Sequence, residues 1–305
     1  MSVFASSSIP SRSTAPTLSS PDQSQPSSTF KFTNTQELFK LIDTTSGDSL
    51  IITSIFIITY QIPFALSTDK LDVTPHDFAD LDEQRTVRGG GFRWRRYYAE
   101  SQILIVAIPT HAHEMLHCIL YEKFRDKVPA RESIWRTKAA TTFTANQDRG
   151  EGDSTGGPIP EQRGRDEWPT LVVEAGVSES LAQLRSDMQW WFAASNHDVK
   201  IVILAKLDDN QRMITLEKWV VEEPVAARPG ATTTRQAAAV QPILQQTITI
   251  HRNEATGPIS YNVTAGALVL ESRLLFLRSP GEGEGEGDII ISVPDLQSYA
   301  ECVWD

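Results

Sequence analysis

Residues 168–207, WPTLVVEAGVSESLAQLRSDMQWWFAASNHDVKIVILAKL, decide the fold class of this chain. The apolar run at 168–176 predicts a strand. Ser180 and Gln183 then form the S-x-x-Q capping box that is typical of a helix start. The run at 198–207 is apolar on nearly both faces, which indicates a central strand covered on both sides. A strand, a helix and a second strand in this order predict a βαβ-like crossover and an α/β fold.

Further elements follow outward from this unit. The apolar run at 103–108 predicts a strand, and Pro109 opens a helical stretch that runs to about Lys127. The segment 128–167 has the composition of a loop. Four more strands and a closing helix are expected at 213–221, 244–252, 267–277, 288–293 and 295–304.

The composition excludes several protein classes. The 305 residues carry a net charge of -11, which argues against a protein that coats nucleic acid by bulk positive charge. Cys118 and Cys302 are too few for a disulfide framework or for a zinc site built from several thiolates. We therefore expect a reducing, intracellular location, in the cytoplasm or the nucleus.

The domain organisation is expected to be simple. Residues 1–30 hold eleven serines and four prolines and predict a disordered tail. Residues 50–66 contain no charge, but β-branched residues dominate them, so one or two buried strands are expected and no membrane span. We expect a single domain at 31–305, with a core at about 92–222 and an extension of further strands at 243–305.

Three acidic residues form one candidate site. Glu174 lies where a strand ends and a helix begins, which is where α/β sheets place ligands. Together with Asp153 it offers carboxylate oxygens for Mg²⁺ or Mn²⁺. Asp187, on the following helix, is expected to face the same end of the sheet. The alternative is that Glu174 interacts only with the helix dipole and that Asp153 is an ordinary loop acid.

A second candidate site is the sequence His113-Glu114-Met115-Leu116-His117. Histidines four residues apart share a helix face, and this H-E-x-x-H spacing suits Zn²⁺ with Glu114 as general base. The sequence offers no obvious third ligand. The alternative is that both histidines are ordinary residues of an amphipathic helix.

The stretch RTVRGGGFRWRRYY at 85–98 is a basic and aromatic patch in an acidic chain. Arginines contact phosphates and aromatic rings stack on bases, so Arg93, Arg95 and Arg96 are candidates for nucleic-acid binding. The alternative is an edge strand with solvated arginines and packed aromatic rings.

Residues 168–207 also resemble a family of fungal hypothetical proteins with a restriction-endonuclease-like core, which belongs to the PD-(D/E)XK nuclease superfamily. The similarity lies in the pattern Glu–x–Gly–x–Ser–Glu–Ser…Leu…Asp…Trp-Trp…Asp-Val-Lys, and it extends backwards through ILIVAIPTHAHE (103–114) and forwards to YAECVW (299–304). It implies a mixed sheet flanked by helices, with additional C-terminal strands.

The resemblance also implies roles for individual residues. Asp153 and Glu174 match the acid pair that binds a divalent metal for phosphodiester cleavage. The superfamily has a lysine two positions after the glutamate, where this chain has Gly176. Lys200 is the candidate replacement, with Asp187 assisting. A divalent-metal nuclease, a catalytically degenerate relative, a zinc hydrolase and a non-enzymatic interaction protein are the resulting hypotheses.

Overall fold

The computed structural model describes most of the chain. The residues it describes are 28–29, 33–47, 54–58, 73–89, 91–129, 131–139, 141–159, 167–221, 241–255, 257–278 and 287–305. The expected disordered tail lies outside these residues, except that Ser28–Thr29 form strand β1.

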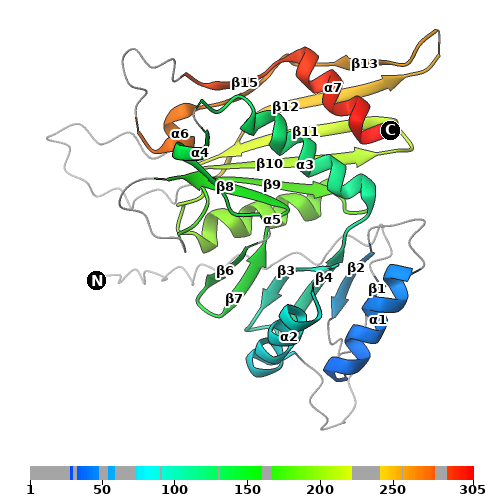
Figure 1. Cartoon of the computed structure of the whole chain (residues 1–305), viewed down its shortest axis with the longest axis vertical. Coiled ribbons are helices and arrows are strands. Elements are labelled where there is room, and N and C mark those ends of the chain that lie inside the picture. Colours follow the sequence, from blue (N-terminus) through cyan, green and yellow to red (C-terminus); the bar gives the residue numbers. More distant parts are fainter. Residues whose placement is uncertain are drawn as a thin grey trace, which may run out of the picture.

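A mixed sheet of seven strands forms the larger part of the fold (Figure 1). Its strands are β5 (Trp135–Thr137), β8 (Ser154–Pro158), β9 (Leu171–Gly176), β10 (Ile201–Asp208), β11 (Met213–Val220), β12 (Ile243–Asn253) and β13 (Ser260–Val263). They are arranged in the order β13-β12-β11-β10-β9-β8-β5. β9 and β10 run parallel, and the other neighbouring pairs run antiparallel. The predicted α/β class and the central position of β10 are therefore confirmed.

Helices cover both faces of this sheet. Helix α5 (Leu181–Ala194) begins at the predicted Ser180 capping box and packs on one face against Val172 and Val202. Helices α3 (His111–Arg125), α6 (Ser272–Phe276) and α7 (Val293–Trp304) pack on the other face, where Val173 and Ile203 point. Because side chains alternate along a strand, the even-numbered residues of β9 point toward α5 and the odd-numbered residues point toward α3.

A second sheet lies beside the α5 side of the first (Figure 1). Its six strands are β1, β2 (Ser54–Ile58), β4 (Ile103–Ile108), β3 (Arg93–Tyr98), β7 (Asp148–Glu151) and β6 (Thr142–Ala145), in this spatial order. Helices α1 (Thr35–Gly47) and α2 (Pro75–Arg88) pack against it through a separate apolar core around Trp94. A ribbon of β14 (Leu268–Leu270) and β15 (Ile289–Ile291) and the single turn α4 (Arg131–Ile134) complete the elements.

The chain crosses repeatedly between the two large sheets. It leaves β4, forms α3 and β5 on the seven-stranded sheet, returns for the hairpin β6–β7, and then enters β8. Residues 152–153 make the last crossing, between β7 and β8. This crossing brings β3 of one sheet close to the end of β9 in the other.

Several predicted elements were wrong. The segment 128–167 was expected to be a loop, but its described part contains α4 and β5–β8. These strands are short and consist largely of polar and glycine residues, so they lack the apolar alternation by which a strand is predicted. The run 267–277 is not one strand, because Glu271 begins helix α6 after β14. β3 is not an edge strand, since it lies between β4 and β7.

Residues 50–53 and 59–66 of the uncharged run lie outside the described residues, whereas Ser54–Ile58 form strand β2. None of the helices in the described ranges combines the length and the apolar character that crossing a membrane requires.

Gly150 lies at the junction of the two sheets and provides a stability test. It is opposite Arg96 in register, and a Cβ there would overlap Arg96 Nη1 and lie 2.6 Å from the Trp190 ring. We expect Gly150→Ala to lower the free energy of unfolding by about 1–3 kcal/mol, because overpacking displaces buried side chains. Urea denaturation measures this change. Gly287→Ala, whose Cβ would meet nothing within 4 Å, is the control; equal stability of the two variants would contradict the packing described.

Candidate functional site

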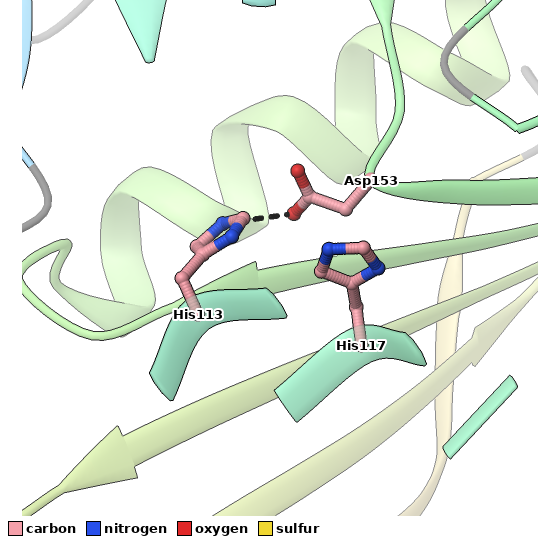
Figure 2. A group of neighbouring side chains, drawn as sticks. All are labelled: His113, His117 and Asp153. Atoms are coloured by element: carbon pink, nitrogen blue, oxygen red, sulfur yellow. Dashed lines mark ion pairs between the residues drawn. The ribbon is translucent and has the colours of Figure 1, made fainter. Parts of the chain in front are cut away.

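Two histidines and one aspartate converge between α3 and the crossing into β8. Thr110 caps α3 by accepting a hydrogen bond from the His113 N–H, and His113 and His117 then lie one turn apart on the buried face of the helix. Asp153 approaches them from the residue before β8 (Figure 2). All three are buried, and their ligand atoms lie within 4.8 Å of one another. The third ligand that H-E-x-x-H lacked in the sequence is therefore present in space.

The contacts of the His113 and His117 ring nitrogens are compatible with coordination of a metal ion. His113 Nε2 lies 3.3 Å from Asp153 Oδ2, yet neither ring nitrogen of His113 makes a hydrogen bond. His117 Nδ1 is 2.9 Å from Ser154 Oγ, which leaves Nε2 to face the cluster. A hydrogen bond at the second ring nitrogen is the usual way in which a metal-binding histidine is oriented.

Asp153 is held in place by the end of β9. Its Oδ2 accepts a hydrogen bond of 2.7 Å from the Ala175 N–H, beside Glu174. Ser154 pairs with Val173 in the antiparallel ladder of β8 and β9, so the position before it comes level with Glu174. The backbone thus brings Asp153 and Glu174 to the same end of the sheet, as the sequence predicted.

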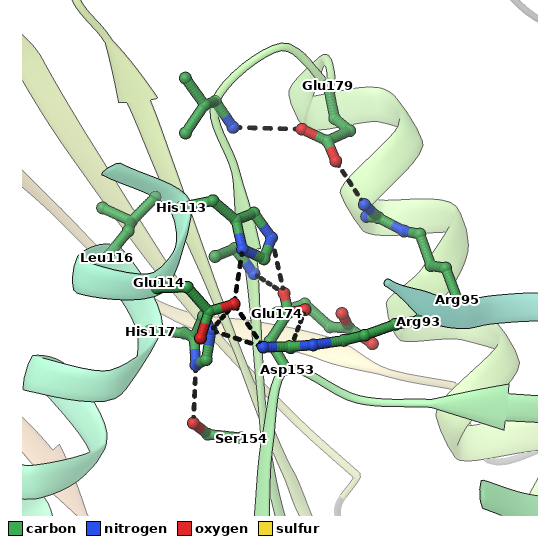
Figure 3. A network of polar contacts seen from close by, with 12 residues as sticks. Arg93, Arg95, His113, Glu114, Leu116, His117, Asp153, Ser154, Glu174 and Glu179 are labelled. Carbon is green, nitrogen blue, oxygen red and sulfur yellow. Dashed lines mark hydrogen bonds and ion pairs between the residues drawn. The ribbon is translucent and has the colours of Figure 1, made fainter. Parts of the chain in front are cut away.

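The guanidinium of Arg93 lies at the centre of the cluster (Figure 3). Its Nη1 donates to Asp153 Oδ1 at 2.7 Å. Its Nη2 donates to Glu114 Oε1 at 2.5 Å and lies 3.2 Å from His117 Nε2. A positive side chain from β3 therefore occupies the space between groups that are all able to bind a cation.

The next arginines of β3 neutralise the remaining acids. Arg95 pairs with Asp187 at 2.7 Å and with Glu179 at 2.5 Å. Arg96 Nη2 lies 3.1 Å from Asp187 and 3.8 Å from Glu174, and its guanidinium is stacked 3.8 Å from the centre of the Trp190 ring. Asp187 thus reaches the acid cluster as expected, through two buried arginines.

These contacts correct the interpretation of β3 as a nucleic-acid surface. Arg95 and Arg96 are 5% and 0% exposed, and Arg93 is mostly buried, so their charges point into the protein. The aromatic residues of the stretch that pack in the second core are also inside. The composition of this stretch is compatible with an exposed, nucleic-acid-binding strand and with a buried strand. The position of β3 between two other strands shows that it is buried.

Glu174 differs from the other acids. It is fully buried on the α5 face, where its Oε1 accepts a hydrogen bond from Trp191 Nε1 while Oε2 has no partner. Burial, together with the charges of Asp153 and Asp187, raises its pKa to about 8. Among the described residues, the metal-ready groups are His113–His117–Asp153 and Glu114–His117–Cys118, and Glu174 belongs to neither.

The charges of the histidine cluster are strongly coupled. Burial opposes a positive charge on His113, but the neighbouring Asp153 outweighs it and raises the pKa of His113 to about 10. Burial likewise opposes charge on Asp153, while His113, His117 and Arg93 hold its pKa well below the ordinary value. Burial and the charge of Glu114 raise the pKa of Cys118 to about 11, so this thiol is not an activated nucleophile.

Lys200 lies at the wrong end of the sheet to replace the superfamily lysine. It precedes β10 and its N–H bonds to Thr170 O, whereas Glu174 pairs with Leu204 four residues further along. That separation is roughly 13 Å along a strand. Lys206 is nearer, because it pairs with Gly176, and its Nζ donates to Val177 O at 2.6 Å.

The sequence analysis missed Glu179, which pairs with Arg95, and Lys206, which lies beside the end of β9. The parallel register of β9 and β10 would have indicated Lys206, since aligning the two apolar runs places it opposite Gly176. No sequence signal identifies Glu179, whose role depends on contact with Arg95 from another sheet.

Comparisons with known proteins add little to this geometry. No protein-family model matches the chain, and no curated protein gives a significant match. One solved structure that matches is described as a "putative nuclease belonging to DUF820", from Anabaena variabilis. It is 13% identical, covers 74% of this chain and 98% of its own, and has a TM-score of 0.38. The chemistry of the site is therefore argued from its own contacts.

The raised pKa of Glu174 predicts a pH-dependent stability. Between the ordinary pKa of 4.5 and about 8, the folded chain keeps a proton that the unfolded chain has lost, so this group lowers the unfolding free energy as pH rises. Glutamine cannot ionise. We expect the stability of Glu174→Gln relative to the wild type to increase from about pH 4.5 to about pH 8 and then to level off.

Urea denaturation at a series of pH values measures this difference. Glu301→Gln, on the exposed side of α7, is the control. A Glu174→Gln difference that is flat across the window, like that of the control, would show that Glu174 ionises normally.

Proposed function

We propose that this protein is a divalent-metal-dependent hydrolase whose ion is bound by His113, His117 and Asp153. The observation that carries the proposal is the convergence of three buried ligand atoms within 4.8 Å. Two imidazoles and one carboxylate are the donor set of many catalytic zinc sites.

The residues fit such an ion. The 3.3 Å between His113 Nε2 and Asp153 Oδ2 matches the separation of two ligands at the 2.0–2.2 Å bond lengths of zinc, about 3.3–3.5 Å in a tetrahedron. His113 Nε2, which faces Asp153 and has no hydrogen-bond partner, is the nitrogen that would exchange its proton for the ion. The nitrogen ligands favour Zn²⁺ or Mn²⁺ over Mg²⁺, which prefers oxygen.

The resemblance to PD-(D/E)XK nucleases supports a phosphodiester as substrate, and thus a nuclease activity. A bound divalent ion supplies Lewis-acid stabilisation of charge on a phosphoryl oxygen and activates water. In this proposal Asp153 keeps its charge, because its pKa is low. Glu174 and Asp187 stay inside the protein with Arg96, so they position the site and do not contact substrate. Lys200 has no role in it, and Mg²⁺ bound by Asp153 with Glu174 is the less favoured form.

A second candidate is a non-catalytic scaffold. The observation that favours it is that Arg93 fills the cluster and that Asp153, Glu174 and Asp187 all have arginine partners. A protein that never binds metal would keep these charges balanced by arginine alone. Metal binding separates the two candidates.

The ligand assignment predicts which variants lose metal. We expect the wild type to bind one equivalent of Zn²⁺ or Mn²⁺ in a calorimetric titration. His113→Ala and Asp153→Asn should lose Mn²⁺ binding because each removes a ligand, and Ser154→Ala should weaken it by about 10–100-fold by releasing His117. His251→Ala, exposed on β12, is the control.

The same proteins test the activity. Cleavage of single- and double-stranded DNA and RNA should require the added ion and disappear with His113→Ala. Binding without cleavage would reject the nuclease and leave a zinc hydrolase with another substrate. A wild type that binds neither ion would support the arginine-filled scaffold.

Arg93 provides an independent test, because it competes with the metal for the same groups. We expect Arg93→Gln to bind the ion about 10–100-fold more tightly, the equivalent of one charged hydrogen bond of about 1.5–3 kcal/mol. Without metal the variant should be less stable, since buried Asp153 loses its partner. Calorimetry and thermal unfolding with and without Zn²⁺ measure both effects. Arg88→Gln, which removes an exposed ion pair with Asp43, is the control. Weaker metal binding by Arg93→Gln would show that Arg93 supports the metal site and does not compete with the ion.

A further inference from the structure

Helix α3 carries a second set of metal-binding groups beside the first. Glu114 and Cys118 lie four residues apart and flank His117 on the same part of the helix. Cys118 Sγ is 3.9 Å from Glu114 Oε2 and lies against the His117 ring, 3.5 Å from Nδ1 and 4.0 Å from Nε2. Glu114 Oε1 is 3.4 Å from the same nitrogen. One thiol, one imidazole and one carboxylate therefore surround a common point.

This outer set differs from the inner one in access. The side chain of Glu114 is 38% exposed, and Cys118 is half-buried. All three residues of the inner set are buried. An ion that arrives from the solvent consequently meets Glu114 and Cys118 before it reaches His113 and Asp153.

The two sets share one atom. His117 Nδ1 is occupied by Ser154 Oγ, so Nε2 is the nitrogen that faces both sets. One imidazole nitrogen binds one ion, which makes the two positions alternatives. Arg93 Nη2 contacts Glu114 and His117 while Nη1 contacts Asp153, so the arginine spans both positions.

We propose that Glu114, His117 and Cys118 form a second, thiolate-containing position for Zn²⁺, which is the accessible entry position for the inner site. The proposal rests on the proposed function for the inner position only. Thiolate is a soft ligand that selects Zn²⁺ over Mg²⁺ and Mn²⁺. When Sγ binds the ion, the thiol releases its proton to the solvent, and no redox step is involved.

Cobalt(II) is the probe, because it replaces zinc and its absorption in the near ultraviolet reports a thiolate ligand. We expect the full-length protein to show this charge-transfer band on titration with Co²⁺. Cys118→Ser should lose the band but still bind one ion at the inner position. Cys302→Ser, which alters the half-buried cysteine of α7, is the matched control and should keep the band.

Two further variants separate the two proposals. His113→Ala should keep the cobalt–thiolate band while it loses the inner position, and His117→Ala should lose both. Stopped-flow mixing should show slower loading of the inner site in Cys118→Ser. Cobalt bound to His113→Ala without a thiolate band, or a band that survives Cys118→Ser, would overturn the outer position. Undiminished Mn²⁺ binding by His113→Ala would instead overturn the inner site, because Mn²⁺ is not expected at the thiolate position.

Discussion

The ion pair between Arg93 and Asp153 is the contact on which the rest of the site depends. It joins β3 of the six-stranded sheet to the crossing that enters the seven-stranded sheet. Asp153 in turn fixes the end of β9 through the Ala175 N–H and faces both histidines of α3. Removing one partner of a buried ion pair costs about 3–5 kcal/mol, because the other charge remains unpaired. The two sheets and helix α3 therefore hold their relative positions through one charge-balanced cluster.

The burial of β3 explains why its arginines are so closely paired. The strand lies between β4 and β7, and Arg95 and Arg96 extend from it toward α5 and the end of β9. Their positive charges could not be buried alone, and neither could Asp187. Burial and the charges of Asp153 and Asp187 raise the pKa of Glu174, whose nearest arginine contact, to Arg96, is 3.8 Å long. Asp153 stays ionised because His113, His117 and Arg93 hold its pKa low.

Sequence alone predicted the local elements well and the site only in part. The β9–α5–β10 crossover was predictable because its apolar period and the Ser180 cap are local signals. Only Glu174 had a recognisable place at a strand end, and the pairing of Asp153 with it came from the resemblance to the acid pair of PD-(D/E)XK nucleases. The meeting of Asp153 with His113 could not be predicted, because it depends on a crossing between two sheets through 128–167, a segment without apolar alternation.

The environment of the β3 arginines also could not be predicted from the sequence. RTVRGGGFRWRRYY has one composition, but an exposed strand would offer its charges to phosphate and a central strand must pair them internally. The choice depends on β7, which pairs with β3 across 50 residues and carries no recognisable strand pattern. The pairing of short polar strands that are distant in sequence thus decides whether the arginines of β3 are exposed to nucleic acid or form ion pairs inside the protein.

The cluster of His113, Glu114, His117 and Asp153 contains a cation of the protein itself, the guanidinium of Arg93. Arg93 neutralises Asp153 and Glu114 from a single guanidinium, which satisfies the charge requirement of the buried acids without an ion. A guanidinium only donates hydrogen bonds, so Arg93 Nη2 can serve the lone pair of His117 Nε2, which lies 3.2 Å away, whereas His113 Nε2 faces Asp153 Oδ2 at 3.3 Å. His113 is held instead as a cation by Asp153, which raises its pKa to about 10, so this histidine would have to give up a proton before it could bind a metal. An entering metal ion would have to displace both the Arg93 guanidinium and the His113 proton, and its bonds to two imidazoles and to Asp153 would have to offset that cost.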